Sequence, residues 1–184
     1  MPVQLNKRLL TVEEYHKMGE VGILQEKNIE LINGEIIAMS PVGSKHLACV
    51  NKLNALLNTL LGTKAIVSVQ NPIVASDLSE PEPDISLLTY RPDFYVNEVP
   101  HAKDVLLVIE VADTSVMYDR EVKLPLYAES SIPEFWLINL EVNEIEVYWL
   151  PSGDAYKFRE LLRPGDVLKG RNVEISFAVK DILG

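Results

Sequence analysis

Two acidic residues, Asp84 and Glu110, stand where carboxylates are costly to bury. Glu110 interrupts the dense apolar segment Val105–Ala112, and Asp84 directly precedes a strand candidate, Ile85–Tyr90. The 26 positions between the two acids allow their strands to pair, which would bring both carboxylates into one pocket. Like charges in a low dielectric repel unless a cation neutralises them, and Mg²⁺ prefers such oxygen ligands. The pair is a candidate magnesium site, although either acid alone could be a satisfied strand-end residue.

A candidate cation follows on the helix predicted over Val116–Ser130. Lys123 lies 13 residues after Glu110 and supplies the positive charge that a hydrolytic site needs. Asp119 lies one turn earlier on the same face, so the alternative is an exposed i, i+4 ion pair with little effect on stability. Because Pro125 has no N–H group, we expect the regular helix to begin near Lys123 or to kink there.

The N-terminal elements are predicted from cap and turn signals. Thr11 and Glu14 match a capping box, which predicts a short helix that Gly19 and Gly22 close. Asn33-Gly34 is typical of a type I′ hairpin turn, because both central residues of that turn need positive φ. We therefore expect hairpin strands at Ile29–Ile32 and Glu35–Met39, followed by a long amphipathic helix at Ser44–Leu61.

The rest of the chain is predicted to form a sheet. Val105–Ala112 is apolar on both alternating faces, as expected for a central strand covered on both sides. In Ile145–Trp149 apolar residues alternate with Glu146 and Tyr148, a pattern typical of a soluble exposed edge. Further strands are predicted at Ala65–Val69, Ile73–Ala75, Ile85–Tyr90, Glu134–Asn139 and Tyr156–Leu161. These elements predict one α/β or α+β domain over residues 1–184.

Composition restricts the class of protein and its partners. The chain has 184 residues, 47% of them apolar, and Cys49 is its only cysteine, which fits a reducing compartment. No export signal or membrane-spanning run is recognisable, so we expect a cytoplasmic protein. The net charge of −10 argues against coating DNA by overall charge. Any contact with DNA needs a local patch, and the candidates are Lys157, Arg159, Arg163, Lys169 and Arg171.

Several short motifs occur in a specific order along most of the chain. They are Glu30-Leu-Ile-Asn-Gly-Glu35, His46, Pro83-Asp84, Val108-Ile-Glu-Val-Ala-Asp-Thr-Ser115, Asp119, Lys123-Leu-Pro-Leu-Tyr127 and Ile132-Pro-Glu-Phe-Trp-Leu-Ile138. Jointly they resemble the PD-(D/E)XK nuclease superfamily and, within it, the restriction endonuclease family called Uma. The superfamily's usual lysine two positions after the acid is missing, because Ala112 stands there. The resemblance implies a restriction-endonuclease-like fold, a mixed central β-sheet flanked by helices, with N-terminal and C-terminal β-hairpins.

The resemblance also implies an activity, the metal-dependent hydrolysis of DNA phosphodiester bonds by an endonuclease. Asp84, Glu110 and the backbone carbonyl of Val111 would hold Mg²⁺, or Mn²⁺ in its place. Lys123, supplied from the following helix, would orient or deprotonate the attacking water and contact the scissile phosphate. Glu30 would complete the acidic pocket directly or through water.

Several alternatives stay open at the level of sequence. Glu30 is equally well explained as a surface acid of a hairpin, and His46 either contacts a phosphate at a helix N-terminus or has a structural role. Core packing or a homodimer seam explains the aromatic residues better than base stacking does; they are Phe135, Trp136, Tyr148 and Trp149. The second function class is a catalytically inactive homologue acting as a dimeric binding or regulatory module. The buried carboxylate on the central strand favours the enzyme.

Overall fold

The computed structural model describes residues 7–183, so the ends of the predicted unit 1–184 lie outside the described residues. Its centre is a six-stranded sheet with the strand order β3-β4-β5-β6-β7-β8. β5 and β6 are parallel, and the other neighbouring strands are antiparallel. The strands are β3 (Ala65–Val69), β4 (Ile85–Thr89), β5 (Val105–Ala112), β6 (Glu134–Asn139), β7 (Glu144–Ser152) and β8 (Ala155–Leu162). The predicted mixed α+β architecture is confirmed.

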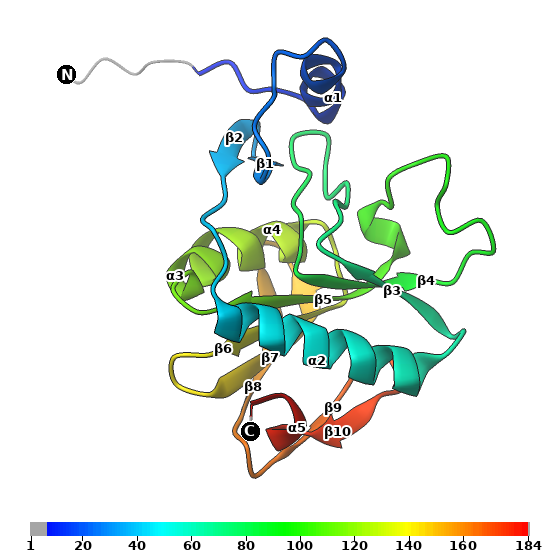
Figure 1. Ribbon diagram of the computed structural model, residues 1–184, viewed down its shortest axis with the longest axis vertical. Helices are drawn as coiled ribbons and strands as arrows, with labels where there is room; N and C mark the ends of the chain where they lie inside the picture. The colour runs from blue at the N-terminus through cyan, green and yellow to red at the C-terminus, as the bar shows by residue number, and fades with distance from the viewer. Residues whose placement is uncertain (1–6, 184) are drawn as a thin grey trace.

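Helices cover both faces of this sheet (Figure 1). The helix α2 (Ser44–Leu61), which has the predicted bounds, lies along one face and shares a hydrophobic core with the C-terminal elements. Those elements are β9 (Val167–Lys169), β10 (Ser176–Ala178) and α5 (Lys180–Leu183). On the other face lie three consecutive helical pieces, α3 (Val116–Tyr118), η2 (Asp119–Lys123) and α4 (Leu124–Glu129). β9 and β10 pair antiparallel, in agreement with the C-terminal hairpin that the resemblance implies. Their bounds were not predicted, because strands of three residues are too short to show alternation.

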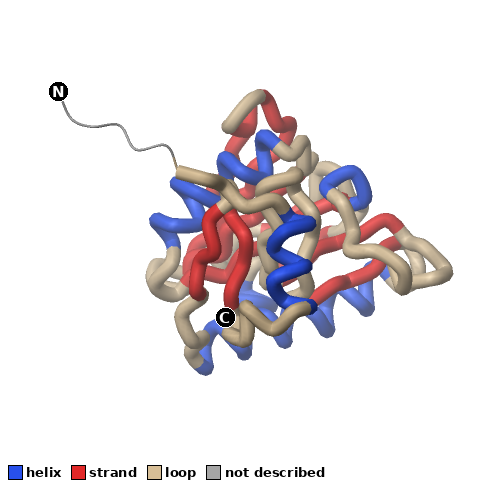
Figure 2. The backbone as a smooth tube through the Cα atoms, turned by 90° about the horizontal axis from the view of Figure 1, so that it is seen from above, coloured by secondary structure: helices blue, strands red, loops and turns tan. Residues whose placement is uncertain are grey.

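An N-terminal arm packs over the second face. It consists of α1 (Val12–Glu20) and the hairpin strands β1 (Ile29–Ile32) and β2 (Glu35–Ala38), which lie in front of the sheet in Figure 2. The predicted capping box at the start of α1 is present. Asn33 and Gly34 have φ values of 49° and 76°, as a type I′ turn requires. Gly34 N donates to Leu78 O at 2.7 Å, so the hairpin turn is tied to the loop before β4.

The strand predicted at Ile73–Ala75 is wrong. The N–H groups of these residues are divided between two segments: Ile73 and Ala75 donate to Pro81 O and Ser79 O, whereas Val74 donates to Pro100 O. A strand needs consecutive bonds to one partner, and here only isolated bridges form. The segment instead joins two loops, of which the 90–104 loop connects β4 to β5 through a short 3₁₀ turn, η1 (Ala102–Asp104).

β7 is an interior strand, and this corrects the prediction of an exposed polar edge. It pairs with β6 on one side and β8 on the other, and Glu146 is 1% exposed. Arg120 and Arg159 both form ion pairs with the Glu146 carboxylate, and the Tyr148 hydroxyl donates to it. These donors satisfy a charge that would otherwise be too costly to bury. The core interpretation of the aromatic residues is confirmed for Phe135 and Trp136, which are both fully buried.

The Glu146 cluster predicts a pH-dependent contribution to stability. Burial opposes ionisation of Glu146, but the hydrogen bonds from Arg120 and Tyr148 outweigh it and lower the pKa. A lowered carboxyl pKa stabilises the fold above the unfolded-state pKa, and this contribution is lost as the pH falls through the folded-state value. We expect Glu146→Gln to reduce the free energy of unfolding by about 1 to 3 kcal/mol at pH 7. Urea unfolding from pH 7 toward pH 3 should show this difference shrinking; a constant difference would contradict the assignment.

The hairpin turn offers a second test of stability. A Cβ atom on Gly34 would lie 2.5 Å from Leu9 Cβ, in addition to the cost of a side chain at a φ of 76°. Gly22 has nearly the same φ, 75°, with nothing within 4 Å. Gly22→Ala should therefore cost about 1 to 2 kcal/mol from backbone strain alone, and Gly34→Ala should cost more. Equal urea midpoints for the two variants would show that the Leu9 contact is unimportant.

Candidate active site

Pairing of β4 with β5 brings Asp84 and Glu110 together, as predicted. Ile85 lies opposite Ile109, so Asp84, at the start of β4, stands next to Glu110 near the end of β5. The Asp84 N–H donates to Glu110 Oε2 at 3.2 Å, and the Val111 N–H donates to Asp84 Oδ2 at 2.9 Å. The backbone of each segment binds the carboxylate of the other, so the two acids form one hydrogen-bonded pair.

Lys123 and Glu30 complete a buried charge cluster. The Lys123 ammonium donates to Glu30 Oε2 at 2.6 Å and lies 3.5 Å from Glu110 Oε1. Lys123 is 4% exposed and Glu30 is 1% exposed. The two alternatives, an exposed Asp–Lys pair for Lys123 and a surface acid for Glu30, are therefore wrong. Asp119 is also buried, and it accepts a hydrogen bond from Ser115 Oγ at 2.7 Å.

The helix predicted over Val116–Ser130 contains a π-helical turn, η2, directly before α4. In a regular α-helix the ring of Pro125 would clash with the carbonyl four residues earlier, so the wider turn accommodates it. Residues five apart align across a π turn, which places Tyr118 and Lys123 on the same side. Tyr127 follows Lys123 by four residues, one α-helical turn. The expected irregularity of the helix near Lys123 is confirmed. The π turn places the side chains of Tyr118, Lys123 and Tyr127 on the side of the helix that faces the site.

Two tyrosines that sequence reasoning missed bind the carboxylates on either side of Lys123. The Tyr127 hydroxyl donates to Glu110 Oε1 at 2.5 Å, and the Tyr118 hydroxyl donates to Glu30 Oε1 at 3.2 Å. Their spacing from Lys123 was the available signal. It could be used only for Tyr127, since the register of Tyr118 depends on the π turn.

His46 and Gln70 contact the other acid, Asp84. His46 Nε2 lies 2.9 Å from Asp84 Oδ2, and Gln70 Nε2 donates to Asp84 Oδ1 at 3.4 Å. The hydrogen bond to Asp84 raises the pKa of His46, against the opposing effect of burial. Since the first turn of α2 carries His46, this helix joins the site from the opposite face of the sheet. His46 therefore lies at the site, bonded to Asp84, and both a structural role and a phosphate contact stay predictions.

The cluster holds more acid than base. Burial raises the pKa of Glu110 to about 8 and that of Asp119 to about 6. Burial opposes the charge of Lys123, but Glu110 and Glu30 outweigh it and raise the pKa of the ammonium. The site therefore favours a bound positive charge in addition to Lys123.

The donor set fits a hard divalent cation. Asp84 and Glu110 offer carboxylate oxygens from adjacent strands. The N–H and C=O of a strand residue point the same way, so the Val111 carbonyl lies on the side where its N–H meets Asp84. Within residues 7–183 there is no cluster of three or more His, Cys, Asp or Glu side chains arranged around a metal position. Two carboxylates and one carbonyl match the few protein ligands that Mg²⁺ takes beside water and substrate.

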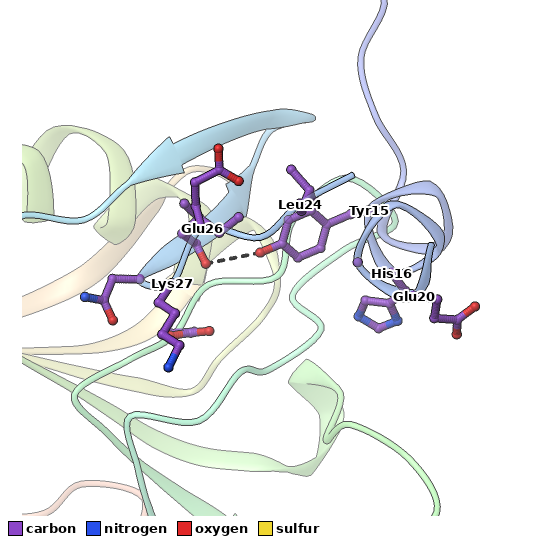
Figure 3. Close-up of a pocket in the computed structure, with 10 residues that line it drawn as sticks. Tyr15, His16, Glu20, Leu24, Glu26 and Lys27 are labelled. Atoms are coloured by element: carbon purple, nitrogen blue, oxygen red, sulfur yellow. Dashed lines mark hydrogen bonds between the residues drawn. The ribbon is translucent and has the colours of Figure 1, made fainter. Parts of the chain in front are cut away.

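A separate cavity of about 500 Å³ lies between α1 and the segment leading into β1 (Figure 3). Tyr15 spans it, and its hydroxyl donates to Ile29 O at 3.1 Å. Glu82 belongs to this cavity, and its N–H donates to Glu30 Oε2 at 3.2 Å. None of the residues predicted for catalysis lines the cavity, so it adjoins the charge cluster without containing it.

The predicted C-terminal basic patch is largely neutralised. Arg159 pairs with Glu146, Arg163 with Glu144 and Arg171 with Glu160. Arg171 also lies over the Trp149 ring. Among the described residues, no helix is long and apolar enough to cross a membrane.

The buried ion pairs predict a large effect of removing Lys123. Lys123→Met should reduce the free energy of unfolding by about 3 to 5 kcal/mol, because two buried carboxylates lose their counter-charge. Adding Glu30→Gln should restore part of the loss, giving a non-additive double-mutant cycle in urea unfolding. Lys45→Met, at an exposed position of α2, is the control. Additive single and double variants would show that the Glu30 and Lys123 charges are not coupled.

Comparison with known proteins places this chain in a family. The model of the family Uma2, described as "Putative restriction endonuclease", matches residues 12–180. No curated protein matches the chain. The fold is similar to the crystal structure of a "putative nuclease belonging to DUF820" from Anabaena variabilis, with a TM-score of 0.70 and 17% identity over 95% of this chain and 97% of the other. The matched range includes every residue of the charge cluster, and the chain belongs to the Uma2 family.

Proposed function

We propose that the protein is a metal-dependent endonuclease that hydrolyses DNA phosphodiester bonds. The observation that carries the proposal is the convergence of Asp84, Glu110 and Lys123 from three separate segments into one buried cluster. Burying this many charges is costly, and a site that acts on a phosphodiester is a physical reason to retain them. Membership of the Uma2 family supports the same reaction class.

Asp84, Glu110 and the Val111 carbonyl would hold Mg²⁺, with Mn²⁺ as a possible substitute. When bound, the ion would lower the pKa of a coordinated water and neutralise charge that develops on the phosphate. All three proposed ligands are oxygens, the donor type that Mg²⁺ and Mn²⁺ prefer.

The other residues of the cluster orient the reactants. The Lys123 ammonium has three N–H donors, of which Glu30 takes one and Glu110 lies near another. A remaining donor can hold the attacking water or a phosphate oxygen. Glu30 keeps the ammonium in place, since its own oxygens are bound by Lys123, the Glu82 N–H and Tyr118. His46 holds Asp84 from below the sheet.

Binding of DNA should be weak, with a shallow dependence on salt. The net charge is −10, and three arginines of the C-terminal patch already pair with glutamates. Lys157 and Lys169 are the exposed patch residues that remain. Few phosphates can be neutralised, so affinity depends on the site itself. The homodimer and the cytoplasmic location stay predictions from the sequence.

A cleavage assay tests the proposal. Supercoiled plasmid and a single-stranded oligonucleotide are incubated at low salt with Mg²⁺ or Mn²⁺. We expect cutting by the wild type that EDTA abolishes. Glu110→Gln and Asp84→Asn, which preserve side-chain shape, should reduce the rate by at least about a hundredfold, on the scale of losing a metal-ion contribution. Glu121→Gln, exposed on the same helical turn as Lys123, should cut like the wild type.

The same experiment distinguishes the alternative function. Folding of each variant is checked by circular dichroism, so that a lost fold is not read as a lost site. No cutting by the wild type, together with no thermal shift when Mg²⁺ or Mn²⁺ is added to metal-free protein, would overturn the enzyme and favour the catalytically inactive, dimeric module. Cutting that survives in both carboxylate variants would place the chemistry elsewhere.

A further inference from the structure

The two oxygens of the Glu110 carboxylate have different partners. Oε1 accepts from the Tyr127 hydroxyl at 2.5 Å and lies 3.5 Å from the Lys123 ammonium. Oε2 accepts from the Asp84 N–H at 3.2 Å. One oxygen therefore faces the helix, and the other faces the neighbouring acid. The Glu110 carboxylate can accept the hydrogen bonds from the Asp84 N–H and from the Tyr127 hydroxyl together only in a narrow range of orientations.

Tyr127 is held rigidly enough to select that orientation. Its side chain is fully buried, and its ring packs against Phe135 at a centroid distance of 5.4 Å. Its backbone carbonyl accepts from the Ile132 N–H at 3.0 Å, which fixes the end of α4. The hydroxyl is the only polar group of the side chain, and it is directed at Glu110 from a wall of core residues.

Lys123 could compete for the same oxygen. It precedes Tyr127 by one helical turn and reaches Glu110 from the same face of the helix. The ammonium lies 3.5 Å from Glu110 Oε1 but 2.6 Å from Glu30 Oε2, so its shorter contact is with Glu30. The Tyr127 hydroxyl therefore holds Glu110 Oε1, the oxygen that the Lys123 ammonium would otherwise attract.

We propose that Tyr127 is the positioning residue of Glu110: its hydroxyl fixes one carboxylate oxygen so that the other stays turned toward Asp84, where the ligands of the proposed metal meet. Tyr127 contacts neither the substrate nor the metal in this role. The expected effect on catalysis rests on the proposed function. The role of Tyr127 in orienting Glu110 does not depend on that function. Without the hydroxyl, the carboxylate should rotate toward Lys123 and withdraw Oε2 from Asp84.

Tyr127→Phe tests this role, and Tyr156→Phe is the matched control. Tyr156 belongs to the same aromatic cluster and stacks on Phe135, but its hydroxyl donates to the Ile132 carbonyl. Both variants remove one hydroxyl that donates a hydrogen bond within the protein, and both keep the ring. Three quantities are measured for each folded variant: the orientation of Glu110 by crystallography, the affinity for Mn²⁺ by titration, and kcat and KM for DNA cleavage.

We expect Tyr127→Phe to rotate Glu110, to weaken Mn²⁺ binding by about 10- to 100-fold, and to lower kcat at a fixed metal concentration with little change in KM for DNA. Tyr156→Phe should leave all three unchanged even if it lowers the melting temperature. An unmoved Glu110 with wild-type Mn²⁺ affinity in Tyr127→Phe would overturn the proposal, as would an equal effect of the control.

Failure of the proposed function gives a different result. If the wild type neither binds Mn²⁺ nor cuts DNA, the nuclease assignment fails, and the crystal structures alone decide the role of Tyr127. A rotated Glu110 in Tyr127→Phe would then support the positioning role, and an unmoved Glu110 would overturn it.

Discussion

The burial of the Lys123 ammonium is the constraint on which the site depends. A charge that is 4% exposed is tolerable only with opposite charge in contact, and Glu30 and Glu110 provide it. Glu30 comes from the N-terminal hairpin and Glu110 from the central strand, so one cation joins the arm to the sheet. The arm therefore does more than cover the core, because removing its acid would leave Lys123 with one buried partner instead of two.

The small residue at position 112 bears on how Lys123 reaches Glu110 from a helix. Residues 110 and 112 of β5 share a face, because side chains alternate along a strand. A lysine at position 112 would have to occupy the fully buried space where Ala112 now packs beside Val116 and Tyr127. The small alanine lets the helical segment approach the strand, and the π turn then directs Lys123 to Glu110. The small strand residue and the irregular helix are thus parts of one arrangement.

Sequence patterns predicted the elements that depend on local signals. The bounds of α2, β3, β5 and β6 follow from periodicity and turn residues, and the adjacency of Asp84 and Glu110 follows from the pairing of their strands. Contacts between distant segments could not be predicted. The bond of His46 to Asp84 crosses the sheet, and the hydrogen bonds of Ile73–Ala75 go to two separate loops. The sequence also did not predict that η2 is a π turn, because an irregular turn near Pro125 can take several forms.

The acidic composition is partly a property of the interior. The buried acids among the described residues are Glu30, Glu80, Glu110, Asp119, Glu134 and Glu146, whereas Lys123 is the only buried Lys or Arg there. Part of the net charge of −10 therefore lies in the interior, where Lys123, Arg120 and Arg159 compensate some of it locally. On the surface, arginines that could bind phosphates pair with glutamates instead. Little attraction for a nucleic acid can come from the rest of the surface, so selectivity must arise at the charge cluster. A metal ion bound there would change the sign of the local field.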